Sequence, residues 1–246
     1  MKDLFIQPNW PAPKNIKAYT TLRTHGVSQP PYDQLNLAEH VADNPQHVAM
    51  NRAILRETLK LPAEPIWINQ THSRIAIQAS PDNRDGEADA SFTDQPDQIC
   101  VVLTADCLPI LVCHRQGTQV AAIHAGWRGL LGGVIEATLD ALALPAKETL
   151  IWLGPAISAT YYEVGPEVRA AFLTQDPETM EAFSPSPNAR WLADLYQLAR
   201  IRLRKKGISA IYGGEYCTYS DPKRFYSYRR DGAKTGRFAT LIYSHL

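Results

Sequence analysis

The stretch ICVVLTADCLPILVCHRQGTQVAAIHAGWRG, residues 99–129, carries the clearest fold signal in the sequence. Its short runs of β-branched and other apolar residues predict buried strands at Ile99–Thr104, Ile110–Cys113 and Gln119–His124. After Gly126 the apolar residues follow a helical period that ends at Pro145. The segment therefore predicts several strands of a buried sheet, followed by a helix.

The sequence on both sides of this segment predicts more strands than helices. Further strands are expected at the following apolar runs: Ala18–Leu22, Ile66–Ile68, Ile75–Ala79, Leu150–Leu153, Ile208–Tyr212 and Phe238–Tyr243. Helices are expected from Pro45, with Asn44 as cap, and at Pro166–Leu173 and Leu192–Lys206. Because no regular βαβ alternation is present, we predict an α+β layered sandwich rather than a doubly wound sheet.

Composition favours one domain and excludes several classes of partner. The chain has 246 residues and no Ser/Gly-rich linker, internal repeat or long run of like charge, so we predict a single domain over residues 1–246. Basic and acidic residues balance at 25 each, which leaves no basic surface for nucleic acid. Neither a signal peptide nor a membrane span is readable at the start, so we expect a cytoplasmic protein with its four cysteines reduced.

Polar residues that follow three of the predicted strands could meet at one sheet edge. They lie in the segments QTHS (70–73), TADC (104–107) and HAGWRG (124–129). Each segment offers one metal ligand: His72, Cys107 and His124. Two imidazoles and a thiolate leave the fourth position of a tetrahedral zinc ion open for water or substrate, as in catalytic zinc sites. Asp106 is our candidate for orienting a ligand or accepting a proton. Gly126 and Gly129 would let backbone or substrate approach the metal.

The residue types by themselves leave a second interpretation open. A single buried cysteine is often a small apolar filler, and a single histidine at a strand end is often only hydrogen-bonded. The three ligands are also far apart in the chain and lack the close C-x-x-C spacing of a zinc finger. The P-loop, the G-x-G-x-x-G fingerprint and the G-x-S-x-G elbow are absent from the sequence, which disfavours nucleotide hydrolysis and serine hydrolase chemistry.

Ordered motifs extend along nearly the whole chain: TLR (21–23), GVS (26–28), NL (36–37), NR (51–52), QTHS (70–73), TADCLP (104–109), HAGWRG (124–129), GPAIS (154–158), YEVG (162–165) and FYSYRR (225–230). In these motifs the sequence resembles the YfiH-like family, also known as laccase-domain or polyphenol-oxidase-like proteins and as purine nucleoside phosphorylases. The resemblance implies zinc bound by His72, Cys107 and His124 on a four-layer α/β/β/α sandwich with mixed sheets. One departure is EADA (87–90), where the family usually has DADA or GDA, and it affects only local hydrogen bonding.

The resemblance also implies two reactions. They are phosphorolysis of adenosine, inosine, guanosine and S-methyl-5'-thioadenosine, and hydrolytic deamination of adenosine. Phosphate needs a cationic clamp, for which Arg23, Arg128 and Arg229 are the candidates, and Asn36 is a further substrate-binding candidate. The expected partners are small nucleosides and phosphate, and the expected state is a monomer or small homo-oligomer.

Three alternatives stay open. Copper is our second choice of metal after zinc, because a multicopper oxidase needs a further histidine-rich cluster and the seven histidines here are scattered. A peptidoglycan-precursor editing hydrolase could cleave an amide with a zinc hydroxide, or with Cys107 as nucleophile and His124 as its base. A non-catalytic zinc protein would need a fourth protein ligand, for which the sequence offers no clear candidate.

Overall fold

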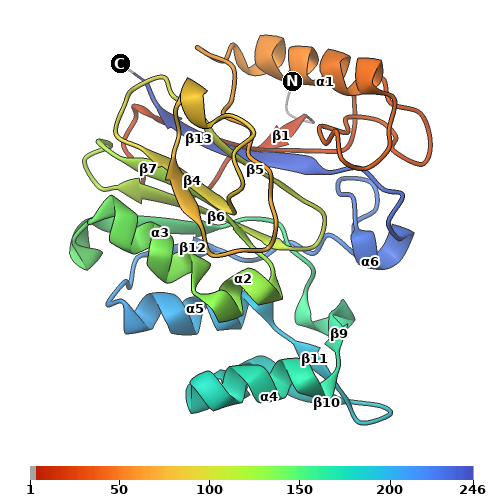
Figure 1. Cartoon of the computed structure of the whole chain (residues 1–246), viewed down its shortest axis with the longest axis vertical. Coiled ribbons are helices and arrows are strands. Elements are labelled where there is room, and N and C mark those ends of the chain that lie inside the picture. The colour runs from red at the N-terminus through yellow and green to blue at the C-terminus, as the bar shows by residue number, and fades with distance from the viewer. Residues whose placement is uncertain (1–3, 246) are drawn as a thin grey trace.

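The computed structural model describes residues 4–245 and arranges them in four main layers (Figure 1). The strands are β1 Phe5–Ile6, β2 Ile16–Thr21, β3 Ala76–Gln78, β4 Ala90–Thr93, β5 Cys100–Thr104, β6 Leu108–His114, β7 Val120–Ala125, β8 Thr149–Leu153, β9 Glu163–Val164, β10 Phe183–Ser186, β11 Arg190–Ala193, β12 Ile211–Gly213 and β13 Phe238–Ser244. The α-helices are α1 Pro45–Leu59, α2 Trp127–Gly132, α3 Val134–Leu142, α4 Pro166–Gln175, α5 Leu195–Lys205 and α6 Tyr228–Asp231. Short 3-10 helices are η1 Pro81–Asn83, η2 Ala146–Glu148, η3 Ala159–Tyr161 and η4 Pro177–Ala182.

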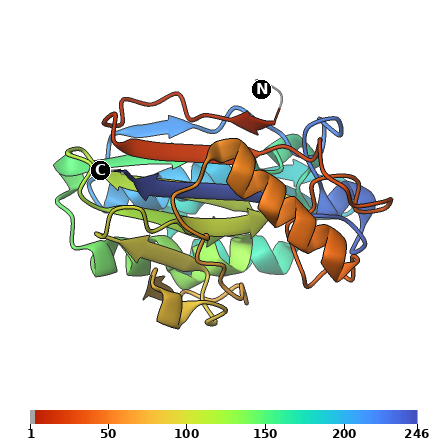
Figure 2. The same ribbon diagram turned by 90° about the horizontal axis from the view of Figure 1, so that it is seen from above.

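Two stacked sheets form the middle layers. The first has the strand order β1-β2-β13-β5 and is antiparallel, and the second has the order β12-β8-β6-β7-β4-β3 and is mixed. Helix α1 covers the outer face of the first sheet (Figure 2), while α2, α3 and α5 cover the outer face of the second (Figure 1). This confirms the predicted α/β/β/α sandwich, in which only the larger sheet is mixed. A small sheet, β10-β11-β9, projects with α4 beyond the helical layer.

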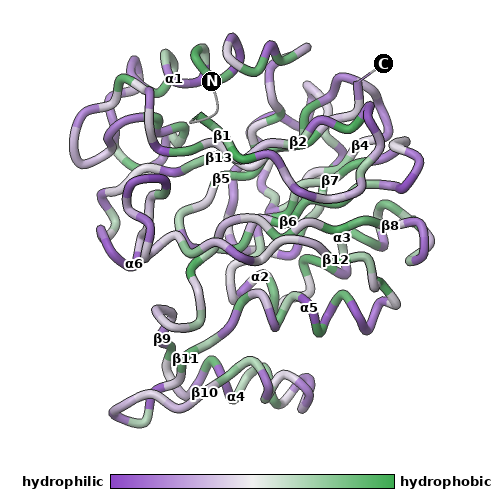
Figure 3. Tube along the Cα trace, turned by 180° about the vertical axis from the view of Figure 1, so that it is seen from behind, coloured by the Kyte–Doolittle hydropathy of each residue, from purple (hydrophilic) through white to green (hydrophobic). Residues whose placement is uncertain are grey.

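The central strands are apolar on both faces because each face packs against another layer. In β6, Ile110 and Val112 pack toward the helices, while Leu111 and Cys113 pack between the sheets. Successive side chains of a strand point to opposite faces, so a strand buried on both sides needs a continuous apolar run. Figure 3 shows the result, since hydrophobic residues concentrate in the central strands and hydrophilic residues on the outer helices.

Helix α1 begins as the sequence predicts. The side chain of Asn44 accepts a hydrogen bond from the backbone N–H of Gln46, and Pro45 occupies the first turn, where its missing N–H costs nothing. Val48 and Leu55 are buried beneath the helix. Residues 23–37, before α1, form a long loop without helix or strand.

Several predicted elements differ from the structure in their bounds. The strand expected at Ile208–Tyr212 is observed only at Ile211–Gly213. The expected strand Ile66–Ile68 forms only one bridge, from Ile66 to Cys100, because the N–H of Trp67 donates to the carbonyl of Pro65 in a tight turn. The helix expected at Leu192–Lys206 begins at Leu195 instead, because the Asp194 side chain caps it and the preceding residues form β11.

Glycine divides a further predicted element. The helix expected after Gly126 is two helices, α2 and α3, which meet at Gly133 in the left-handed conformation with φ of 88°. The sequence also missed five short strands, namely β1, β4, β9, β10 and β11. These strands lack long β-branched runs and exist because neighbouring strands offer them backbone hydrogen bonds.

Within residues 4–245, none of the helices combines the length and the apolar character needed to cross a bilayer. The cytoplasmic location, the absence of a nucleic acid partner and the oligomeric state all stay predictions.

Candidate metal centre

A loop, a turn and the end of a strand bring His72, Cys107 and His124 together. Cys107 lies in the turn between β5 and β6, and His124 lies near the end of β7, where it pairs with Pro109 of β6. The hydrogen-bonded β6–β7 pair therefore brings these two ligands together, although they are 17 positions apart in the sequence. His72 comes from the loop before β3, in the left-handed conformation with φ of 61°.

The three ligand atoms lie within 4.8 Å of one another. The Sγ atom of Cys107 is 3.9 Å from Nε2 of His72, and the rings of His72 and His124 meet edge to face with centroids 4.8 Å apart. In a tetrahedral zinc site, metal–ligand bonds of about 2.3 Å to sulfur and about 2.0 Å to nitrogen place the ligand atoms roughly 3.5 Å apart. The observed spacing fits one shared ion of this size.

Exposure of the ligands decreases from His72 through Cys107 to His124. The His72 residue is exposed, Cys107 is intermediate, and His124 is 4% exposed. One side of the centre therefore faces solvent, and the other is sealed in the core. A reactant can approach from the side of His72.

Asp89, which is fully buried, organises the inner side of the centre. Its Oδ1 atom is 2.7 Å from Nδ1 of His124, so the other ring nitrogen, Nε2, is left for the metal. The same carboxylate accepts hydrogen bonds from the backbone N–H groups of Thr71, His72 and Ser73, and from the Ser73 hydroxyl. One side chain thus orients one ligand and holds the loop that carries another.

The surroundings of Cys107 favour its thiolate in the metal-free protein. Burial raises the pKa of this thiol, but the neighbouring His124 and His72 outweigh burial and lower the pKa to about 6. Burial in turn lowers the pKa of His124, and the Cys107 thiolate and Asp89 carboxylate raise it. A thiolate beside a carboxylate-held imidazole is suited either to a metal ion or to nucleophilic chemistry.

Gly126 leaves space for two of the ligands. A Cβ atom at this position would lie 2.9 Å from Cys107 Sγ and 3.1 Å from His72 Cδ2. The predicted close approach at Gly126 is thus confirmed, whereas a Cβ at Gly129 would meet its nearest atoms at 3.4 Å.

We expect Gly126→Ala to lower zinc affinity roughly tenfold without unfolding the protein. The backbone of Gly126, with φ of –72°, accommodates alanine, so the added methyl group acts by displacing Cys107 and His72. Competition with a chromophoric chelator measures the affinity. The matched control is Gly132→Ala in α2, whose Cβ would lie 3.9 Å from its nearest neighbour, Arg74. Equal zinc affinity in both variants would contradict this interpretation.

Comparison with known proteins identifies the family. Residues 17–245 match the family described as multi-copper polyphenol oxidoreductase laccase. A Pseudomonas aeruginosa protein named purine nucleoside phosphorylase is 51% identical over 240 residues, which are 97% of this chain and 98% of that protein. The Escherichia coli K12 protein named purine nucleoside phosphorylase YfiH is 47% identical over 239 residues, again 97% of this chain and 98% of that protein. The chain belongs to the YfiH-like family.

Solved structures of YfiH-like proteins share the fold. A crystal structure of a Neisseria meningitidis protein superposes with a TM-score of 0.94 at 48% identity, covering 98% of this chain and 99% of that one. The YlmD protein of Geobacillus stearothermophilus, at 26% identity, has a TM-score of 0.89 and covers 99% of this chain and 100% of its own. The layered architecture is therefore that of the YfiH-like family.

In this YfiH-like chain, Asp106 connects the metal centre to the C-terminal segment. Its carboxylate is 7% exposed and accepts hydrogen bonds from the Thr218 hydroxyl at 2.6 Å, the Ser227 hydroxyl at 3.0 Å and the Arg229 backbone N–H at 2.6 Å. These contacts make Asp106 a positioning residue for the loop beside Cys107. Its predicted role as acid or base stays a prediction.

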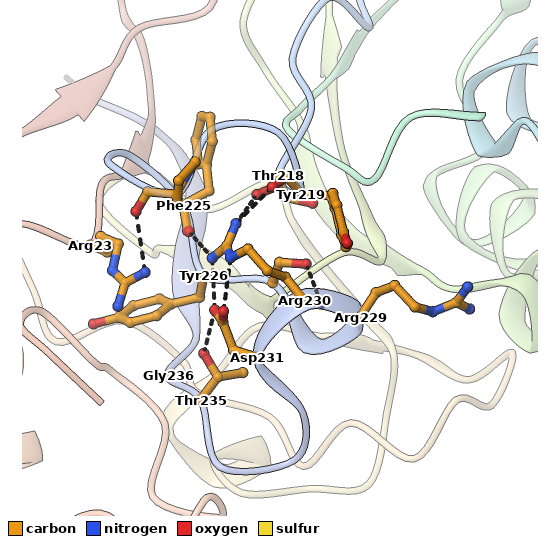
Figure 4. Close-up of polar contacts among 12 residues, drawn as sticks. Arg23, Thr218, Tyr219, Phe225, Tyr226, Arg229, Arg230, Asp231, Thr235 and Gly236 are labelled. Carbon is orange, nitrogen blue, oxygen red and sulfur yellow. Dashed lines mark hydrogen bonds and ion pairs between the residues drawn. The ribbon is translucent and has the colours of Figure 1, made fainter. Parts of the chain in front are cut away.

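Arg230 stabilises the same C-terminal segment. Its guanidinium donates to the carbonyls of Thr218, Tyr219 and Phe225 and pairs with Asp231, whereas the side chain of Arg229 extends away from this network (Figure 4). The network fixes the backbone from which Arg229 projects.

Two of the predicted substrate-binding residues are occupied by structural contacts. Arg23 donates to the backbone and carboxylate of Asp33, donates to the carbonyl of Pro222, and lies over the ring of Tyr226 at 4.7 Å. Asn36 is fully buried and uses its amide group for contacts within the fold. Substrate binding by Asn36 and Arg23 stays a prediction, and the burial of Asn36 and the contacts of both side chains favour a structural role.

The other two predicted arginines are exposed near the centre. Arg128 follows the His124 segment and lies over the ring of Trp127 at 4.5 Å. Arg229 donates to the carbonyl of Glu163 and lies over the ring of Tyr162 at 5.2 Å. Burial raises the pKa of Tyr162, Cys107 and Asp106 raise it further, and Arg229 and Arg128 oppose the rise, so these groups act on one another electrostatically.

Sequence analysis missed three residues around the centre. Asp89 appeared only as part of the variant EADA motif, although the aspartate preserved within that motif was a usable signal. His40 has a lowered pKa because of burial and because Arg237, Arg52 and His124 are nearby. Neither His40 nor Arg237 stands in a motif that local sequence reasoning could connect with His72 or Cys107.

Proposed function

We propose that this chain is a zinc-dependent purine nucleoside phosphorylase that also deaminates adenosine. The observation that carries the proposal is the convergence of His72, Cys107 and His124, with His72 on the solvent side. The names of the relatives from Pseudomonas aeruginosa and Escherichia coli support the substrate class. The proposed substrates are adenosine, inosine, guanosine and S-methyl-5'-thioadenosine, as the family resemblance implies.

Zinc is our choice of metal on the donor set. Two imidazoles and one thiolate suit zinc with a fourth position open, but the same donors occur in blue-copper sites. All seven histidines lie within the described residues, where the cluster of His72, Cys107 and His124 is the one group placed to share a metal. A multicopper oxidase needs a further copper cluster, so the donor set favours zinc despite the family description.

Phosphorolysis requires phosphate oxygen to bond to C1' of the ribose as the bond from C1' to N9 of the purine breaks. The purine leaves with the electron pair and takes up a proton, and the products are ribose 1-phosphate and the free base. Arg128 and Arg229 are placed to neutralise the phosphate, because both are exposed beside the centre and neither pairs with a carboxylate of residues 4–245. Zinc, when bound, supplies Lewis-acid chemistry.

Deamination uses the same entry side but needs no phosphate. Oxygen from water replaces the amino group at C6 of adenine, and ammonia leaves. His72, Cys107 and His124 would hold the metal for this reaction, while Asp89 keeps His124 in the required tautomer. A single centre can therefore serve both reactions, with phosphate deciding between the two outcomes for adenosine.

A peptidoglycan-precursor hydrolase is the second candidate. It is favoured by one observation, namely that Cys107, His124 and Asp89 form a thiol, imidazole and carboxylate series like that of cysteine hydrolases. In this alternative, Cys107 attacks an amide carbonyl, and His124 passes its proton to the amine that leaves. Water then hydrolyses the thioester on Cys107, which releases the carboxylic acid and regenerates the thiol. This version, with Cys107 as the nucleophile, would work without zinc, whereas a version that uses a zinc hydroxide would not.

The test is to incubate zinc-loaded protein with adenosine in the presence and absence of phosphate. We expect adenine and ribose 1-phosphate with phosphate, and inosine without it. Removal of zinc by a chelator should abolish both products, and re-addition should restore them. Failure to convert any of the four nucleosides, together with cleavage of a muropeptide amide by chelator-treated protein, would replace the proposal with the second candidate.

A further inference from the structure

Arg237 lies beside the metal centre because two strands of one sheet pair there, and it belongs to none of the sequence motifs that contain the ligands. Strand β13 begins at Phe238, which pairs with Thr104 at the end of β5. The chain of β5 runs on through Ala105 and Asp106 to Cys107, and Arg237 immediately precedes Phe238 on the neighbouring strand. The same sheet end thus supplies both the metal-binding thiol and this guanidinium.

The backbone of Arg237 is held firmly by the loop before α1. Its N–H donates to Oδ1 of Asn36 at 2.9 Å, and its carbonyl accepts from the N–H of Leu37 at 3.2 Å. Asn36 is itself fully buried, and its amide group also binds Ala38 and Asp43. The guanidinium therefore starts from a rigid anchor, which is how a preorganised binding group is supported.

Two nitrogens of the Arg237 guanidinium, Nε and Nη2, have hydrogen-bond donors that are not used within the described part of the protein. Its Nη1 atom donates to the carbonyls of Thr235 and Gly236, at 2.8 Å and 2.9 Å, and it lies 5.8 Å from the ring centre of Tyr228. Over the described part of the chain, Nε and Nη2 have no hydrogen-bond acceptor and no carboxylate forms an ion pair with Arg237. Both of these nitrogens, Nε and Nη2, are accessible to solvent. Two parallel donors of this kind match the oxygens of a phosphate.

The charges that act most strongly on Arg237 are those of Cys107 and Asp106 at the metal centre. Burial lowers the pKa of this guanidinium, and Cys107 and Asp106 are the strongest opposing influences. Arg237 is also the strongest charge acting to lower the pKa of His40, on which His124 acts as well. A partly buried cation without an ion-pair partner among the described residues, next to an open metal centre, is suited to binding an anionic ligand.

We propose that Arg237 binds inorganic phosphate, the second substrate of phosphorolysis, through its free Nε and Nη2 donors. The inference rests on the proposed phosphorylase function and adds to it a residue that belongs to neither the metal ligands nor the recognised motifs. It also gives Asn36 a role, since Asn36 positions the phosphate-binding residue rather than the nucleoside. Arg128 and Arg229, which are exposed, stay candidates for further contacts with phosphate.

The first experiment compares steady-state phosphorolysis of inosine by wild-type protein, Arg237→Gln and Arg237→Lys while phosphate is varied. Loss of a charged double hydrogen bond predicts that KM for phosphate rises roughly 10- to 100-fold in Arg237→Gln, with a smaller rise in Arg237→Lys, which keeps the charge but not the paired donors. Adenosine deamination, which uses no phosphate, should fall far less than phosphorolysis does. Unchanged KM for phosphate in a folded Arg237→Gln protein overturns the inference.

The matched control is Arg115→Gln, which removes the same charge at the far end of β6 from Cys107. The KM for phosphate of Arg115→Gln should equal that of the wild-type protein. If Arg237→Gln does not fold, Arg237→Lys decides, and an unchanged KM in that variant likewise counts against the inference.

A binding measurement separates this inference from the proposed function. Calorimetric titration of zinc-loaded protein with inorganic phosphate should show binding to the wild type and to Arg115→Gln, and weaker binding to Arg237→Gln. Wild-type protein that binds phosphate through Arg237 yet cleaves no nucleoside would refute the phosphorylase function alone. A different result would refute only the role of Arg237. In that case the wild-type protein cleaves nucleosides, and Arg237→Gln binds phosphate as tightly as the wild type does.

Discussion

Cys107→Ala is expected to purify with little or no zinc and to retain less than about one hundredth of the wild-type nucleoside turnover. The substitution removes the only anionic ligand and leaves two imidazoles, one of them on the exposed side of the centre. Loss of an outer-shell partner already costs roughly 10- to 100-fold in metal affinity, and loss of a direct ligand costs more. Inductively coupled plasma mass spectrometry measures the zinc, and product chromatography measures turnover.

Cys113→Ala is the matched control for this variant. Cys113 is a fully buried cysteine at the other end of β6, where it packs between the two sheets, and burial raises the pKa of its thiol to about 12. We expect its substitution to lower stability slightly through a small cavity and to leave zinc content unchanged. Zinc retained at wild-type stoichiometry by Cys107→Ala would eliminate the proposed ligand set.

Asp89→Asn is expected to weaken zinc binding roughly 10- to 100-fold and also to destabilise the fold by about 3 kcal/mol. The buried carboxylate accepts from His124 and from the backbone of Thr71, His72 and Ser73, whereas an amide would turn an NH₂ group toward some of these donors. The imidazole of His124 would lose its orientation, and the loop carrying His72 would lose its anchor. Chelator competition measures affinity, and urea denaturation of zinc-free protein measures the free energy of unfolding.

Asp94→Asn provides the comparison for Asp89→Asn. The two aspartates flank the same strand, β4, but Asp94 is exposed and its side chain accepts a hydrogen bond from neighbouring Gln95. Its substitution should change neither zinc affinity nor stability by a measurable amount. If Asp89→Asn unfolds at the same urea concentration as Asp94→Asn and binds zinc normally, the organising role assigned to Asp89 is incorrect.

The clustering of His72, Cys107 and His124 was predictable because two of these residues lie at the ends of strands whose apolar pattern is visible in the sequence. The apolar runs before Cys107 and through His124 predicted adjacent buried strands, and the observed β6–β7 pairing places Pro109 opposite His124. For His72 the reasoning was less direct, since the strand expected at Ile66–Ile68 is a single bridge and the loop is instead held by Asp89. The structure places His72 in the cluster as predicted but on a different element from the expected one, and its role as a metal ligand stays a prediction.

Asn36 and Arg237 show the limit of sequence reasoning. A motif indicates that a residue matters, but it does not distinguish a side chain that binds substrate from one that binds the backbone of another segment. Asn36 proved to be buried and hydrogen-bonded to Arg237, which is 201 positions away. Neither periodicity nor spacing encodes such a contact.

The sequence alone determined the strands that are buried on both faces, the helix caps, and the three side chains suited to one metal ion, because these depend on local pattern and residue chemistry. The tertiary structure decided which groups support that chemistry: Asp89 behind His124, Asp106 beneath the C-terminal segment, and Arg237 beside Cys107. Those contacts form when two sheets stack and distant strands align in register. Their geometry arises from packing of the whole chain and has no signature within any one segment.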